Sequence, residues 1–183
     1  MSKIIIAALL ASAAAAPAFA QDTASGPTFT GAHVEALGGW DRLQANNGHD
    51  DGVLYGVGAG YDIQRGGAVI GIEGEATDST QKERVGALTE HASRDLYAGA
   101  RVGVVVGGTN LLYAKAGYTN ARYGVSGTGT DTFAHGNLDG VRVGAGVEHA
   151  LGSRAFVKAE YRYSNYEQGV TRNQVVGGIG LRF

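Results

Sequence analysis

The chain has 183 residues, a formal net charge of −2 and no cysteine. It is therefore long enough for one domain, has no disulfide framework, and lacks the positive charge that is typical of nucleic-acid-binding domains. Glycine is unusually frequent at 31 residues, while the two prolines and a mean hydropathy of −0.08 exclude a collagen-like chain and a helical membrane bundle.

The first twenty residues have the pattern of a secretory signal peptide. Lys3 precedes an apolar run over residues 4–16, and Ala18-Phe19-Ala20 has the small-x-small form of a cleavage site. We expect cleavage between Ala20 and Gln21, with residues 1–20 as the signal peptide and 21–28 as a short N-terminal segment. The apolar run is too short to cross a bilayer as a helix, which takes about 20 residues. An N-terminal amphipathic or core helix is the alternative interpretation.

From Phe29 onward, apolar and polar residues alternate with a period of two, which predicts strands. The pattern gives eight segments: 29–40, 53–63, 68–77, 94–106, 111–119, 138–150, 155–164 and 172–183. Their lengths match the roughly 9–11 residues of a tilted membrane-spanning strand, whereas strands of soluble proteins average about 5–6 residues.

The links between these segments alternate in length. Three short links, at 64–67, 107–110 and 151–154, contain glycine, as expected for turns with positive φ. The other links are longer and polar, as in the stretch 46–52 of the link 41–52. Short turns at one end and long loops at the other are typical of outer-membrane barrels, with periplasmic turns and extracellular loops. We therefore predict an all-β fold: an eight-stranded antiparallel up-and-down transmembrane barrel over residues 29–183.

One parity of each segment is apolar and the other carries the charges, so the two faces of the sheet must meet different surroundings. We expect lipid on the apolar side, because an Arg or Lys at the bilayer midplane costs about 2–4 kcal/mol. The charges would then pair inside the barrel as a lumen ion network of five acids and five bases: Glu35, Glu73, Glu75, Glu148, Glu160, Arg101, Lys115, Arg142, Lys158 and Arg162. A soluble, lipocalin-like barrel with these charges on its solvated outer face is the competing interpretation.

Large aromatic residues on the apolar side gather near the ends of the segments, as in the interfacial girdles of membrane barrels. This set predicts an aromatic belt: Trp40, Tyr55, Tyr61, Tyr118, Tyr161 and Tyr163. Phe183 ends the last segment on the same face.

Three stretches carry a family resemblance: residues 141–148 (VRVGAGVE), 158–164 (KAEYRYS) and 177–183 (GGIGLRF). In these the chain resembles the small OmpA-like or opacity-type "porin family" barrels of Gram-negative bacteria, most strongly over 138–183. The resemblance implies the cell outer membrane as location, and outer-membrane lipid and the barrel-assembly machinery as partners. It also implies that Phe183 is the assembly signal, because such barrels characteristically end in an aromatic residue that this machinery recognises.

The search for chemistry yields weak candidates. Ser164-Asn165 is similar to part of the lipid A deacylase motif, but Arg162 stands where that motif has its histidine, so the base that would activate the serine is missing. The five histidines show no metal-ligand spacing, although His49, His91 and His135 fall in separate outer loops that could meet at the barrel mouth. The glycine-rich run 56–60 is not followed by a helix, so it favours strand packing over phosphate binding.

We therefore expect a non-catalytic barrel without cofactors or metals. It would support envelope integrity, contact a surface ligand through its loops and bind no nucleic acid. A narrow porin-like channel for ions or small solutes is the alternative.

Overall fold

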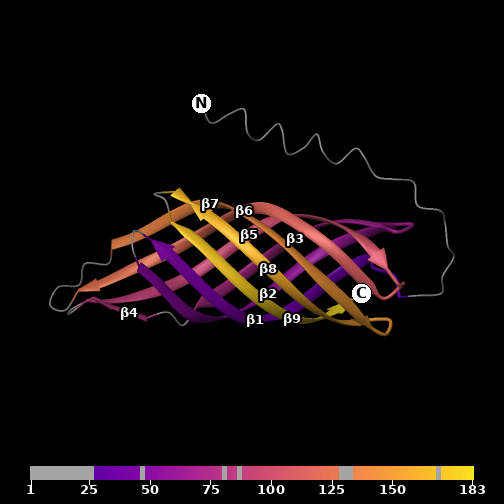
Figure 1. Cartoon of the computed structure of the whole chain (residues 1–183), viewed down its shortest axis with the longest axis horizontal. Coiled ribbons are helices and arrows are strands. Elements are labelled where there is room, and N and C mark those ends of the chain that lie inside the picture. Colours follow the sequence, from indigo (N-terminus) through magenta and orange to yellow (C-terminus); the bar gives the residue numbers. More distant parts are fainter. Residues whose placement is uncertain (1–26, 46–47, 80–81, 86–87, 128–133, 168–169) are drawn as a thin grey trace, which may run out of the picture.

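The fold is a closed barrel of eight long antiparallel strands (Figure 1). The computed structural model describes residues 27–45, 48–79, 82–85, 88–127, 134–167 and 170–183, with backbone alone at 43–45, 48–50, 82–85, 88–93, 122–127 and 134–137. The strands are β1 (Gly31–Ala45), β2 (Gly48–Arg65), β3 (Ala68–Ser79), β4 (Lys82–Val85), β5 (Leu88–Val106), β6 (Asn110–Gly127), β7 (Ala134–Leu151), β8 (Ala155–Tyr166) and β9 (Thr171–Arg182). Among the described residues, no helix is long and apolar enough to cross a bilayer.

The pairing of β1 with β9 and of β3 with β5 closes the barrel. Every long strand then has two neighbours, and the short strand β4 pairs with β5 at the end of the barrel away from the C-terminus (Figure 1). Beyond the end of β9, the backbone N–H of Phe183 still donates to the carbonyl of Ala32 at 2.8 Å. The ladder between the first and last strands therefore continues to the end of the chain.

Each of the eight predicted segments corresponds to one barrel strand, and the predicted fold class is confirmed. The short links form tight turns at 66–67, 107–109 and 152–154, which define what we call the turn end of the barrel. Positive φ occurs there at Gly66, Gly107, Gly108 and Gly152, as the sequence predicted.

At the opposite end, which we call the loop end, the strands are longer than predicted. Ladders run on to Ala45↔Gly48 between β1 and β2 and to Leu88↔Gly127 between β5 and β6. Much of the three longest links is therefore paired strand, because antiparallel neighbours continue to satisfy each other's backbone groups beyond the apolar part of the sequence.

The first strand begins at Gly31 and not at Phe29, so that predicted boundary was wrong. Phe29 instead closes the turn end from inside: its ring is buried with Val69, Leu111 and Tyr113. Its backbone N–H donates to Oε1 of Gln64 at 2.8 Å, and its carbonyl accepts from Arg182. These contacts replace the pairing that a strand residue would have.

Inward-facing glycines make room for large side chains that lie along the inner wall. A Cβ on Gly146 would lie 2.6 Å from the carbonyl oxygen of Ala159 and 2.7 Å from the Tyr113 hydroxyl. The outward-facing Gly177 has ordinary space, since its Cβ would meet its nearest neighbour, the Gly38 carbonyl, at 3.7 Å. The inner glycines are therefore packing residues.

We expect Gly146→Ala to lower the free energy of unfolding by about 1–3 kcal/mol, the range for overpacking a filled interior. Gly177→Ala is the matched control and should change it little. Reversible urea unfolding in detergent, followed through the fluorescence of Trp40, the single tryptophan, measures both. Equal effects of the two substitutions would contradict the packing role.

Candidate functional site: the ion-paired lumen

Most of the barrel interior is filled with charged side chains, beside two small apolar clusters around Phe29 and Leu37. Strand alternation turns one parity inward, and all ten predicted network residues are buried there. Lys158 and Arg162 are among them. In a soluble barrel these charges would lie on the outer face, so their burial in the lumen favours the membrane barrel. The structure adds five further buried charges to the set: Asp41, Asp62, Asp95, Arg172 and Arg182.

At the turn end, two carboxylates and two arginines form what we call the turn-end cluster. Arg101 Nε donates to Asp62 at 2.8 Å, and Arg101 Nη1 lies 3.2 Å from Glu148. Arg182 contacts the same two carboxylates, each at 2.7 Å. Two cations shared between two anions hold β2, β5, β7 and β9 together across the lumen.

His33 lies beside this cluster, with its Nδ1 3.4 Å from Asp62 and its ring edge against Phe156. It is buried, and neither ring nitrogen makes a hydrogen bond within the described residues. The imidazole therefore packs as a largely apolar group between the turn-end cluster and β8.

The middle of the lumen holds the central cluster, built around Lys115. Its Nζ lies 2.8 Å from Glu73, 2.7 Å from Glu75 and 2.9 Å from Glu160. The remaining members extend this arrangement: Arg162 contacts Glu75 at 2.8 Å and also pairs with Glu160, and Lys158 contacts Glu35 at 2.6 Å.

Three carboxylates this close to one another have the composition of a cation site. Here the ammonium group of Lys115 lies between them and supplies the positive charge. The three carboxylates therefore surround a lysine ammonium group in this structure.

Towards the loop end, Asp41, Asp95, Arg142 and Arg172 form the loop-end cluster. Arg172 donates to Asp41 at 2.7 Å and to Asp95 at 3.0 Å, and Arg142 pairs with Asp95 as well. Arg142 Nε also donates to the hydroxyl of Ser164 at 2.9 Å.

Charge is almost balanced along the lumen. The turn-end and loop-end clusters each combine two acids with two arginines, and the central cluster has four acids and three bases, which gives eight acids and seven bases among the described residues. Buried charges are tolerated where they are paired and hydrogen-bonded. The contacts also link the clusters, at 3.9 Å between Arg101 and Glu73 and at 3.8 Å between Arg142 and Glu75.

The outer face is apolar over a defined height. On β7 the outward positions are Asp139, Val141, Val143, Ala145, Val147 and His149. Asp139 and His149 are ten residues apart and bound the apolar positions between them. Ten residues of a strand tilted by roughly 40° rise about 26 Å along the barrel axis, which matches the height of about 25 Å of the apolar band on membrane barrels. All six residues of the predicted aromatic belt are exposed on this face; their interfacial role stays a prediction.

The remaining predicted residues fall as follows. Phe183 is 72% exposed on the outer face. His149 lies on the outer face near the turn end, where its Nδ1 is 2.8 Å from Oδ1 of Asn110. Ala20, Gln21 and the side chains of His49, His91 and His135 lie outside what the structure describes.

A family model described as "Outer membrane protein beta-barrel domain" matches residues 6–183. The chain belongs to this family. Its location is accordingly the cell outer membrane, with the apolar face towards lipid. No curated protein matches the sequence significantly.

Solved structures show the same fold. Neisserial surface protein A (NspA) is 18% identical, with a TM-score of 0.66 over 84% of this chain and 98% of that one. Ail of Yersinia pestis, in complex with the heparin analogue sucrose octasulfate, is 14% identical, with a TM-score of 0.65 over 84% and 99%. The N-terminal barrel domain of OprF from Pseudomonas aeruginosa is 18% identical, with a TM-score of 0.57 over 87% and 100%.

We expect Lys158→Met to lower the free energy of unfolding by about 3–5 kcal/mol, because it leaves the buried Glu35 without its ammonium partner. Adding Glu35→Leu to this variant should restore most of the loss, since a buried pair replaced by apolar groups is often nearly neutral. A double-mutant cycle from urea unfolding measures the coupling. Additive effects of the two substitutions would show that the 2.6 Å contact does not couple the residues.

Proposed function

We propose that this protein is a non-catalytic barrel that supports the integrity of the outer membrane and presents its loop end as a surface for interaction. The observation that carries this proposal is the combination of a lumen filled by paired charges with strands that run on beyond the apolar band. The filled lumen argues against the passage of solutes through the barrel. The strand extensions give the loop end a surface made of paired strands.

The strand extensions are substantial. Beyond the outermost apolar position Val53, β2 continues five residues to Gly48, and β6 continues seven residues beyond Asn120 to Gly127. At about 3.4 Å per residue along a strand, these extensions of β2 and β6 project beyond the bilayer. The complex of Ail with a heparin analogue is an example of a barrel of this size that binds a ligand.

The geometry around Ser164 supports a non-catalytic role. The serine is buried within β8, where its hydroxyl accepts from Arg142 at 2.9 Å. Arg162, two residues earlier, is paired with Glu75 and Glu160. A permanently protonated guanidinium cannot act as the general base that serine nucleophiles use.

The functional test is genetic. We expect loss of the protein to make the source bacterium more sensitive to detergent and to antibiotics that are too large to cross the intact outer membrane. A variant in which a two-residue Asn-Gly turn replaces residues 122–137 should restore resistance as well as the unaltered protein, because the ladder at Ala121↔Leu138 still closes the barrel. Resistance that depends on the trimmed hairpin would contradict the assignment of integrity to the barrel itself.

The narrow pore is the second candidate function, because the lumen is lined by polar and charged side chains. We expect planar-bilayer recordings of the refolded wild type to show no steady openings, since the turn-end, central and loop-end clusters occupy the lumen. Glu160→Gln and Arg101→Gln, which weaken the pairing, should produce brief openings. Steady wild-type conductance that neither substitution changes would favour the pore.

Phe183 is proposed as the residue that the barrel-assembly machinery recognises. Its ring faces outward, while its backbone N–H belongs to the closing ladder. We expect removal of Phe183 to impair assembly in cells far more than refolding into detergent, where no machinery acts. Heat-dependent gel migration measures the folded fraction in both settings, and equal losses would leave the recognition role unsupported.

A further inference from the structure

The charges inside the barrel are sorted along the chain. Among the described residues, the inner faces of β1, β2 and β3 carry five buried acids and no lysine or arginine: Glu35, Asp41, Asp62, Glu73 and Glu75. The inner faces of β5 to β9 carry seven buried bases and three acids: Arg101, Lys115, Arg142, Lys158, Arg162, Arg172, Arg182, Asp95, Glu148 and Glu160. We call these two sets of strands the acidic half and the basic half of the barrel.

The need for pairing does not by itself require this sorting. Buried charges are tolerated next to a partner of opposite sign, and acids that alternate with bases on neighbouring strands would meet that need within each half. Here each acid of the acidic half pairs with a lysine or arginine of the basic half. The ion pairs therefore join the two halves of the sheet to each other.

The two halves meet along β3 and β5 and again along β1 and β9. We call the second meeting line the seam, because β1 and β9 are the two ends of the sheet. Three ion pairs among the described residues bridge it: Asp41 with Arg172 at 2.7 Å, Glu35 with Lys158 at 2.6 Å, and Asp62 with Arg182 at 2.7 Å. These pairs belong to the loop-end, central and turn-end clusters, so the seam is bridged at three heights.

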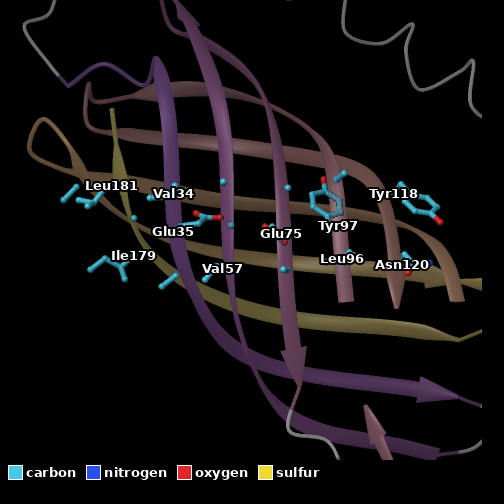
Figure 2. Close-up of a pocket in the computed structure, with 18 residues that line it drawn as sticks. Val34, Glu35, Val57, Glu75, Leu96, Tyr97, Tyr118, Asn120, Ile179 and Leu181 are labelled. Atoms are coloured by element: carbon cyan, nitrogen blue, oxygen red, sulfur yellow. The ribbon is translucent and has the colours of Figure 1, made fainter. Parts of the chain in front are cut away.

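Glycines let the central of these three pairs form. Lys158 lies opposite Gly178 of β9, where a Cβ would be 3.0 Å from Cγ of the lysine. Glu35 lies opposite Gly58 of β2, where a Cβ would be 2.6 Å from Oε1 of the glutamate. Figure 2 shows the Glu35 side chain extending from β1 towards β2. The lysine, which starts on β8, can therefore reach over the backbone of β9 to a carboxylate beyond the seam.

We propose that the opposite charges of the two halves act as an electrostatic clasp that draws β1 and β9 together when the barrel closes. Before closure, the strands form a sheet whose two ends carry inner charges of opposite sign. The screening length is about 10 Å at 0.1 M salt and about 30 Å at 0.01 M. The attraction therefore begins before the backbone groups of the seam are close enough to pair. Opposite charges speed the association of two proteins in the same way.

Asp41 and Asp95 make a matched pair for a test of the clasp. Both are buried in the loop-end cluster, and both contact Arg172. Asp41 belongs to the acidic half, whereas Asp95 belongs to the basic half. Asp41→Asn therefore lowers the difference in charge between the halves, and Asp95→Asn raises it. Each substitution removes a buried ion pair, so a role in stability alone affects both variants alike.

Refolding of the full chain from urea into nonionic detergent, sampled over time by heat-dependent gel migration, measures the rate of closure. In about 0.01 M salt, we expect Asp41→Asn to close about threefold to tenfold more slowly than wild type. Asp95→Asn should close at least as fast as wild type. In about 1 M salt, where the screening length is about 3 Å, wild type should close more slowly and the variants should no longer differ. Both variants should unfold faster than wild type in urea.

Glu35→Gln and Glu160→Gln repeat the comparison in the central cluster, in case a loop-end variant does not refold. Glu35→Gln should slow closure and Glu160→Gln should not. Equal slowing by the two members of a matched pair would overturn the clasp, because the ion pairs would then only stabilise the closed barrel. A wild-type closure rate that does not change with salt would also overturn it. The clasp acts during closure, so it is independent of the function proposed for the closed barrel.

Discussion

The structure depends on one constraint: every backbone N–H and C=O within the hydrocarbon must have a partner inside the protein, because an unpaired group costs several kcal/mol there. The pairing of β1 with β9 satisfies this requirement by removing the last free edge. Gly31 serves the same closure. It has a φ of +133°, and the terminal backbone at Phe183 approaches it more closely than a side chain would allow. Once the ring of strands is closed, the alternation of side chains divides every strand between lipid and lumen.

The lumen follows from the size of that ring. Eight strands enclose a space that side chains can fill, and in this chain they are the charged parity. Ion pairs in such a place are costly to bury and costly to break, so the arrangement favours one fixed interior over several interchangeable ones. The three clusters share partners, and Glu73 and Glu75 connect the central cluster to both ends. For this reason the interior ion pairs connect strands that are distant in the sequence.

The outer wall faces lipid, and it differs from place to place in shape although it is apolar throughout the band. Valine, isoleucine and leucine fill most of the wall, while alanine and glycine align in register over several strands and leave a depression there. A polar group on this wall is tolerated where the bilayer becomes wet, as at Asp139, Asn120 and Asn173. The last of these accepts a hydrogen bond from Tyr161 at 2.7 Å.

The sequence by itself determined the number of strands, their alternation and the side that faces lipid, because period-two patterning and segment length are local properties of the chain. It also indicated the ten predicted charges of the lumen. Asp62 and Arg182 share the parity of the neighbouring inner glycines, so parity alone could have identified them, whereas Asp41 lies beyond the predicted end of the first segment. Only the tertiary structure decided which charges pair and that Lys115 lies among three glutamates. It also decided that the Phe29 ring is buried inside the turn end, and that the strands continue past the apolar band. Register and closure set these features, since they join residues far apart in the chain, such as Lys158 and Glu35, and no local pattern records such distances.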